Sequence, residues 1–222
     1  MLTDLLQITR GLTAIIGGGG KTTLMYALAK ELCAYGRVVV CTTTHIYPPA
    51  QLPCLTDGRE ETARRLLAQE GCICVGTAAE NGKLSAPALP FSALLDMADF
   101  VLAEADGSRG RPLKAHAARE PVIPPETAQT VLVLGASGFG KPIAEAAHRP
   151  ELYAAKLGVG TEEPVTPMLA ARLLKTEHLH DRVLVNQADT PEERALARSF
   201  AAQMDCPVCY GSLQKGELEC WY

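Results

Sequence analysis

The residues best suited to chemistry form a glycine-rich segment near the start of the chain. The segment consists of Gly17, Gly18, Gly19, Gly20, Lys21, Thr22 and Thr23. An apolar run over residues 12–16 precedes it and a helical pattern over residues 24–32 follows, which is the strand, turn and helix context of a phosphate-binding loop. In such loops backbone N–H groups and a helix start face the phosphates. We expect Lys21 to reach the terminal phosphates of ATP or GTP, and the Thr22 hydroxyl to bind Mg²⁺.

The spacing departs from the common pattern G-x-x-x-x-G-K-[ST], which has a glycine where this chain has Ile15. The loop therefore has a shorter G-x-x-G-K-T-T form and is similar to the loop of Mur-type amide ligases. A tight turn without a ligand is the alternative, although a turn alone would not need the entropy loss of four consecutive glycines. A later segment, Gly135–Pro142, fits G-x-x-x-x-G-K better, but Pro142 offers no hydroxyl for Mg²⁺. We interpret that segment as a strand followed by a glycine loop.

Acidic residues follow a second apolar run, over residues 100–103. The segment Glu104–Arg111 reads E-A-D-G-S-R-G-R, and a strand ending in acids has the form of a Walker B element. If the strand continues far enough, Glu104 and Asp106 project to one side and could bind Mg²⁺ and polarise a nucleophile. Arg109 could neutralise charge during phosphoryl transfer. Exposed acids just past a strand and a solvated basic loop are the alternatives.

A β-branched run over residues 37–41 predicts another buried strand, which ends in the sequence T-T-T-H. In an open α/β sheet, the loops at the carboxyl ends of the strands hold the ligand. We therefore expect Thr44 and His45 beside the phosphate loop, where they could bind Mg²⁺ through water or sense the terminal phosphate. Hydroxyls that satisfy only the loop's own backbone are the alternative.

The apolar run over residues 182–185 predicts a further strand, followed by N-Q-A-D. This run resembles the guanine-reading motif N-K-x-D, so Asn186 and Asp189 are candidates to face the base. Gln187 replaces the lysine of that motif, which leaves the choice between ATP and GTP open. Local capping is the alternative for both residues.

The alternation of predicted strands and helices favours an α/β protein with a P-loop NTPase-like, mostly parallel, doubly wound sheet. We expect a single nucleotide-binding domain over residues 1–222, with a small insertion at about residues 50–90 after the second strand. Within it, Asp57–Glu60 reads as a capping box that opens a helix, Gly71 ends that helix, and Asn81–Gly82 predicts a hairpin turn. Residues 207–211 are expected to form the closing strand.

The composition limits the class of protein. With 222 residues, 47% of them apolar, the chain can bury a substantial core. Its net charge of −4 gives no reason to expect nucleic acid as a partner. We expect no membrane span and no signal peptide, because no apolar run is long enough for a bilayer and charges interrupt the first residues. A cytoplasmic location is the resulting expectation.

The chain has eight cysteines, and without a secretion signal we expect them to be thiols. Cys72 and Cys74 would share one face of a buried strand. Cys206 and Cys209 have the C-x-x-C spacing of redox and zinc sites, but only Cys220 follows them. We favour buried, small apolar side chains over metal binding for these residues.

Several of these segments occur together in one family. They are G-G-G-G-K-T-T at Gly17–Thr23, T-T-T-H-I at Thr42–Ile46, E-A-D-G-S-R-G-R at Glu104–Arg111, H-R-P-E at His148–Glu151 and N-Q-A-D at Asn186–Asp189. In this order they resemble the YqeC family of selenium-dependent hydroxylase accessory proteins, also described as selenium cofactor biosynthesis proteins. Gly17–Thr23 match that family's phosphate loop, and Glu104 with Asp106 match its acidic motif. His148 and Arg149 match a third block that has no assigned task.

The resemblance implies a nucleotide-binding protein that helps to mature a labile selenium cofactor in molybdenum hydroxylases such as xanthine dehydrogenase. A molybdenum hydroxylase or a cofactor-maturation protein would then be its partner. Our main hypothesis is Mg²⁺-dependent binding of ATP or GTP, with hydrolysis or phosphoryl transfer. One alternative is an ATP-dependent ligase or small-molecule kinase with a short, Mur-like loop. Another is a non-catalytic, nucleotide-dependent switch or metallochaperone.

Overall fold

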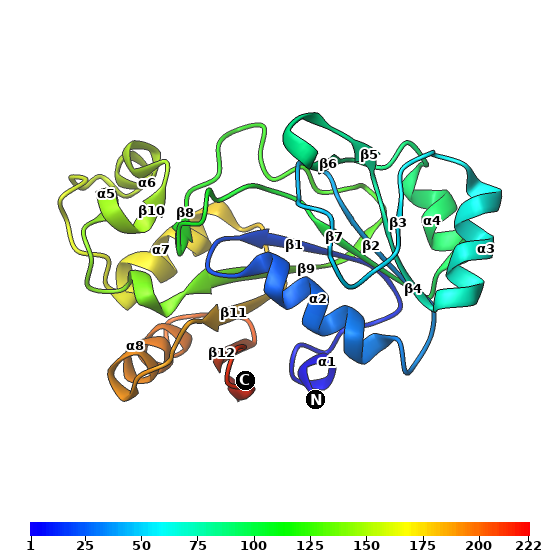
Figure 1. Cartoon of the computed structure of the whole chain (residues 1–222). Helices are drawn as coiled ribbons and strands as arrows, with labels where there is room; N and C mark the ends of the chain where they lie inside the picture. The colour runs from blue at the N-terminus through cyan, green and yellow to red at the C-terminus, as the bar shows by residue number, and fades with distance from the viewer. The chain divides into compact units, whose positions relative to one another are not determined.

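The computed structural model describes residues 1–222 and has an α/β fold (Figure 1). Its strands are mostly parallel and are flanked by helices, which confirms the P-loop NTPase-like, doubly wound class predicted from the sequence. The chain divides into two compact units. The first comprises Met1–Ile15, Thr22–Asp106 and Val122–Gln129, and the second comprises Ile16–Lys21, Gly107–Pro121 and Thr130–Tyr222. The single domain over residues 1–222 stays a prediction.

The first unit contains five parallel strands in the order β1-β7-β2-β4-β3. Their bounds are Gly11–Gly17 for β1, Val38–Thr42 for β2, Cys54–Leu55 for β3, Cys72–Val75 for β4 and Phe100–Glu104 for β7. Strand β1 belongs to this unit as far as Ile15. Every residue of β2, β4 and β7 is buried. Continuous apolar runs of this kind are typical of parallel strands that are covered on both faces.

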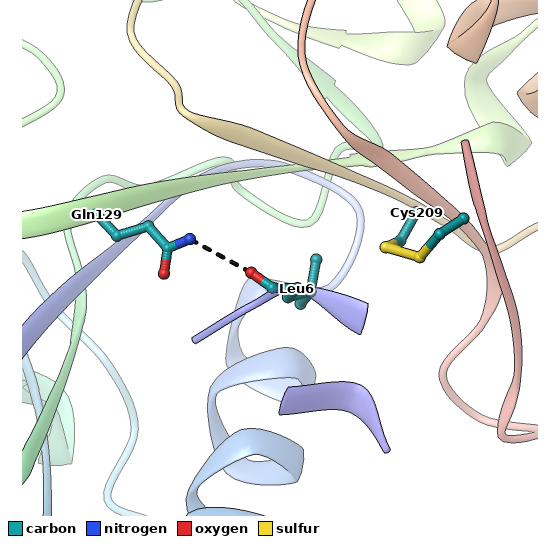
Figure 2. Close-up of a disulfide and its surroundings, with 4 residues drawn as sticks. Leu6, Gln129 and Cys209 are labelled. Atoms are coloured by element: carbon teal, nitrogen blue, oxygen red, sulfur yellow. Dashed lines mark hydrogen bonds between the residues drawn. A yellow bond between two sulfur atoms is a disulfide. The ribbon is translucent and has the colours of Figure 1, made fainter. Parts of the chain in front are cut away.

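The helices of the first unit are α1 (Leu2–Leu5), α2 (Lys21–Leu32, from Thr22 in this unit), α3 (Glu60–Glu70) and α4 (Phe91–Met97). The amide of the buried Gln129 donates a hydrogen bond to the carbonyl oxygen of Leu6, just after α1, at 3.3 Å (Figure 2). No helix of the structure combines the length and the apolar character needed to cross a bilayer.

The structure corrects the sequence-based description of residues 50–90. The Asp57–Glu60 capping box is wrong, because α3 begins after Arg59 and the Asp57 carboxylate instead accepts a hydrogen bond from the Arg59 N–H at 2.9 Å. Gly71 ends α3 in a left-handed conformation, as predicted. The predicted hairpin is confirmed by the antiparallel strands β5 (Thr77–Ala78) and β6 (Leu84–Ser85), joined through the 3₁₀ turn η1 (Glu80–Gly82). Strand β4 pairs in parallel with β2, so the antiparallel part is confined to this hairpin.

The second unit contains four strands in the order β9-β11-β12-β13, and a separate parallel pair formed by β8 and β10. Their bounds are Leu113–Lys114 for β8, Thr127–Gly135 for β9, Ala147–His148 for β10, Arg182–Asn186 for β11, Val208–Ser212 for β12 and Glu217–Trp221 for β13. Strand β9 belongs to this unit from Thr130 onward. Strand β13 runs antiparallel to β12. The strand predicted at residues 207–211 is confirmed as β12, but the expectation that it closes the fold is wrong, because β13 follows it.

The helices of the second unit are η2 (Ala136–Gly138), α5 (Ile143–Ala146), α6 (Pro150–Leu157), α7 (Pro167–Glu177) and α8 (Pro191–Ala201). Two of them begin as local sequence signals predict. The Thr166 hydroxyl accepts from the Leu169 N–H at the start of α7, and Thr190 and Glu193 form a capping box at the start of α8.

A disulfide joins the last two strands (Figure 2). Cys209 of β12 and Cys220 of β13 are directly opposite in the antiparallel register and are bonded to each other. The expectation that all cysteines are thiols is thus wrong for this pair, and Cys209 is not available to form a metal site with Cys206. The other six cysteines are free, and burial raises the pKa of one of them, Cys41, to about 12.

A buried polar network links two distant segments of the second unit. The Glu177 carboxylate at the end of α7 lies 2.6 Å from Nδ1 of His116 and accepts from the His116 backbone N–H at 2.8 Å. The Lys156 ammonium on α6 donates to the same carboxylate at 2.7 Å. Burial acts to raise the pKa of Glu177, but the hydrogen bonds from His116 and Lys156 outweigh burial, and the pKa is lowered.

The disulfide predicts a thiol count. Denatured protein without reductant should show six reactive thiols, and eight after reduction. Cys220→Ser should show seven without reductant and should lose about 3 kcal/mol of stability, the amount expected for a short closed loop. Cys206→Ser is the matched control, with five thiols and little loss. Eight thiols in unreduced protein would contradict the assignment.

The Glu177 network predicts a pH-dependent loss of stability. Because the folded-state pKa of Glu177 is lowered, its contribution is present above the ordinary pKa of 4.5 and disappears as pH falls through the folded-state value. Glu177→Gln should therefore cost about 3 kcal/mol at pH 7, as for a broken buried ion pair, and less at acidic pH. Urea unfolding at several pH values measures this. The exposed Glu162→Gln is the control, and equal effects of both variants at pH 7 would refute the role of the network.

Candidate functional site

The glycine segment joins β1 to α2, which is the strand, loop and helix context that the sequence predicts. Gly17 and Gly19 have positive φ angles of 98° and 67°. A Cβ atom would lie 2.2 Å from the Val133 carbonyl oxygen at Gly17, and 2.3 Å from the Gly135 nitrogen at Gly19. Close packing within the second unit therefore requires these glycines, with or without a ligand.

Two amides of the loop are used by the fold. The Gly18 N–H donates to the Val133 carbonyl at 2.8 Å, and the Gly19 N–H donates to the Arg111 carbonyl at 3.2 Å. These amides bond to neighbouring backbone segments of the second unit. The glycines of the loop are thus accounted for by packing and by backbone hydrogen bonds, and support for a phosphate site has to come from other residues.

Lys21 gives such support. Its side chain is buried, with 4% of the residue exposed, and its ammonium group donates to the Gly17 carbonyl oxygen at 2.7 Å. Both residues belong to the second unit, so the cation lies across the loop from the helix start to the strand end. A buried ammonium held among backbone groups is what a phosphate loop presents to its ligand.

The later glycine segment at residues 135–142 is built differently. Lys141 is exposed, and the short helix α5 follows Pro142. The Ser137 hydroxyl donates to the Gln187 side-chain oxygen at 2.7 Å. This segment therefore lacks both the buried cation and the long following helix of the first loop.

The predicted Mg²⁺ ligands lie in the first unit. The Thr22 hydroxyl, in the first turn of α2, donates to the Glu104 carboxylate at 2.7 Å, although 82 positions separate the two residues. Glu104 is the last residue of β7 and is 6% exposed, and Asp106 is fully buried just beyond it. The structure thus brings the predicted hydroxyl and one predicted carboxylate into direct contact.

These ligands can be tested against the chemistry of Mg²⁺. No group of three or more His, Cys, Asp or Glu side chains is arranged to hold a metal ion. Mg²⁺ is commonly bound through one or two carboxylates, with substrate phosphates and water completing its shell. A threonine hydroxyl in contact with a buried carboxylate fits that mode of binding.

The hydroxyls after β2 have local roles. The Thr42 hydroxyl donates to the Glu104 carbonyl at 2.8 Å and accepts from the Thr44 N–H at 3.0 Å. The Thr44 hydroxyl lies 3.4 Å from that of Thr42, and His45 is exposed. Thr42 therefore stabilises the end of the strand that carries Glu104. The roles of Thr44 and His45 toward a nucleotide stay predictions.

Asn186 and Asp189 lie at the end of β11 in the second unit. The Asn186 amide donates to the Gly19 carbonyl at 2.8 Å, and its side-chain oxygen accepts from the Leu213 N–H at 3.0 Å. Asn186 thus fixes the glycine loop to the segment after β12. Asp189 is exposed, and its backbone carbonyl accepts from the Lys215 ammonium. A base-reading role for the Asp189 carboxylate stays a prediction.

Basic residues of the second unit gather around one acid that the sequence analysis missed. The Lys114 side chain is fully buried and pairs with Glu120 at 2.9 Å, and Arg149 pairs with the other carboxylate oxygen at 2.8 Å. Arg109 is exposed in the preceding loop, with φ at +50°. Glu120 gave no signal in the sequence, because its pairing with Arg149 depends on a contact between segments 29 positions apart.

Comparison with known proteins places the chain in a family. A family model described as "YqeC protein" matches residues 13–151, which include the glycine loop, the acidic segment and His148–Arg149. The "Uncharacterized protein YqeC" of Escherichia coli (strain K12) is 33% identical over 149 residues, which are 64% of this chain and 58% of that relative. The chain therefore spans less than two thirds of the relative's length. On the strength of the family match, the chain belongs to the YqeC family.

Proposed function

We propose that this protein binds a nucleoside triphosphate with Mg²⁺ and hydrolyses it or transfers its terminal phosphoryl group. The observation that carries the proposal is the 2.7 Å hydrogen bond between the Thr22 hydroxyl and the Glu104 carboxylate. Thr22 directly follows the buried Lys21 in the chain. A lysine, the hydroxyl that follows it in the chain and a strand-end carboxylate are the groups that P-loop enzymes use for phosphates and Mg²⁺.

Each residue would have a separate task. Lys21 would exchange its bond to the Gly17 carbonyl for the phosphate oxygens and neutralise their charge. Thr22 and Glu104 would hold Mg²⁺, with Asp106 as a further acid near the end of the same strand. When bound there, Mg²⁺ would supply additional charge neutralisation on the phosphates. Arg109 would add positive charge from the loop that follows.

The product distinguishes the three reactions. Hydrolysis gives free phosphate, whereas a kinase gives a phosphorylated acceptor and a ligase gives an acyl phosphate on the way to its product. Because the loop is short and Mur-like, the kinase and ligase reactions should be tested together with hydrolysis. Binding without measurable turnover would instead support the nucleotide-dependent switch.

We further propose that this activity serves the maturation of a selenium-containing molybdenum hydroxylase. Membership of the YqeC family supports this part of the proposal. Purified hydroxylase or a cofactor-maturation protein should bind the chain with an affinity that depends on ATP or GTP. An affinity that is the same with and without nucleotide would count against it.

Lys21 should determine nucleotide affinity. Lys21→Met keeps much of the side-chain volume and removes the charge, and it should weaken ATP or GTP binding by about 10- to 100-fold, as expected for the loss of a charged hydrogen bond. Isothermal titration with each nucleotide, with and without Mg²⁺, measures this. Lys30→Met alters an exposed lysine of the same helix and should bind like the unmodified protein. Nucleotide affinity unaffected by Lys21→Met in a folded protein would overturn the proposal.

Thr22 should determine the effect of Mg²⁺. Thr22→Val keeps the shape and removes the hydroxyl, so the gain in nucleotide affinity that Mg²⁺ provides should fall by about 10-fold, and Thr22→Ser should retain it. Thr23→Val is the matched control, because Thr23 is the exposed neighbour on α2. If Thr22→Val and Thr23→Val respond alike to Mg²⁺, the metal assignment is wrong.

A further inference from the structure

Four basic residues of the second unit form a group that the proposed function leaves largely unused. This basic cluster consists of Arg109, Lys114, His148 and Arg149. Lys114 and His148 are register partners in the parallel pair formed by β8 and β10, and Arg149 follows directly in the chain. The cluster therefore unites the loop after Asp106 with the His148–Arg149 block, for which the sequence suggested no task.

The electrostatics at His148 show an excess of positive charge. Burial lowers the pKa of His148, and the charges of Lys114, Arg149 and Arg109 lower it further. Glu120 acts in the opposite direction, but its carboxylate already pairs with both Lys114 and Arg149. His148 and Arg149 are partly exposed and Arg109 is exposed, so a ligand can reach this positive region from solvent.

The backbone holds two of these cations in an unusual conformation. Arg149 and Arg109 have φ angles of +63° and +50°, a region that costs a non-glycine residue about 1 kcal/mol or more. Such conformations persist only where the surrounding structure enforces them. The Glu120 pairing anchors Arg149, and the buried bonds of His116 to Glu177 anchor the segment that carries Lys114.

The segment that carries the cluster also packs on the phosphate loop within the second unit. The Arg111 carbonyl accepts from the Gly19 N–H, and the Pro112 carbonyl accepts from the Gly135 N–H at 2.8 Å. Gly17 and Lys114 line the same small internal cavity. A ligand of the basic cluster would therefore be bound by a segment in direct contact with the residues proposed to bind the nucleotide.

We propose that the basic cluster binds the oxyanion group of a small molecule, such as a phosphate, a sulfate or a carboxylate, which serves as the second substrate. The binding of the anion stands on the cluster alone, and its part as a second substrate rests on the proposed function. Arg149 and Arg109 would donate hydrogen bonds to the oxyanion, as guanidinium groups do. Protonated His148 would add a further donor, and the buried Lys114 would contribute its charge.

The experiment follows the His148 imidazole by NMR in isotope-labelled protein, with His148→Asn to assign its signals. Without nucleotide, inorganic phosphate or sulfate should raise the pKa of His148 by about one pH unit, because a nearby opposite charge favours the imidazolium. Chloride at equal ionic strength should leave this pKa unchanged. Since the free-state pKa lies below 6.5, sulfate affinity should increase as the pH falls below 6.5. An unchanged pKa with phosphate and sulfate would overturn the proposal.

Variants locate the site. Arg109→Gln and Arg149→Asn should each reduce the anion-induced change in the pKa of His148 and weaken sulfate binding by about 10-fold, the loss of one charged hydrogen bond. Arg109 is exposed, so its variant carries little risk to the fold. Arg119→Gln, an exposed arginine of the same segment, is the matched control and should behave like the unmodified protein. Equal loss in Arg119→Gln and Arg109→Gln would show non-specific attraction and overturn the proposal.

An experiment with nucleotide distinguishes failure of this proposal from failure of the proposed function. Lys21→Met should weaken nucleotide binding and keep the response of His148 to sulfate. If ATP with Mg²⁺ shifts His148 but free phosphate and sulfate do not, the cluster serves the nucleotide's own phosphates and the second-substrate proposal fails. If sulfate shifts His148 in a protein that binds no nucleotide, the anion site stands, and the proposed function and the second-substrate role both fail.

Discussion

The close approach of the glycine loop to neighbouring backbone is the constraint on which the site depends. A Cβ atom at Gly17 or Gly19 would overlap the backbone of residues 133–135, so only glycine allows the loop to lie there. That position lets the Lys21 ammonium reach back to the Gly17 carbonyl oxygen. Asn186 completes the arrangement by holding the Gly19 carbonyl. The placement of the cation thus follows from backbone packing.

Local sequence signals predicted the parts of this site that depend on neighbours in the chain. The strand, loop and helix around Gly17–Thr23 involve interactions over a few residues, and the structure confirms them. The failure at Asp57 is also local. Its carboxylate could cap a helix or accept a hydrogen bond from the Arg59 N–H in a turn, and in the structure it makes the turn. Short polar side chains often offer such competing bonds.

Contacts between distant segments were the part that sequence could not provide. Strand β13 alternates exposed and half-buried residues at the edge of the sheet, so its apolar signal is weak. Without that strand, the bond from Cys209 to Cys220 could not be foreseen. Glu177 meets His116 across 61 positions, and no spacing rule reports such a pairing. The contact between Thr22 and Glu104 was expected only because both motifs were assigned to the same metal.

The double use of glycine affects how the loop should be interpreted. Close backbone packing and close approach of a phosphate both require a residue without a side chain, so a glycine run alone cannot separate the two. Here packing explains Gly17 and Gly19, and the amides of Gly18 and Gly19 are bonded to the fold. The functional argument therefore depends on charged and hydroxyl groups. Burying a lysine ammonium costs free energy unless polar groups compensate for the lost water, and the Lys21 ammonium is buried with a hydrogen bond to the Gly17 carbonyl oxygen.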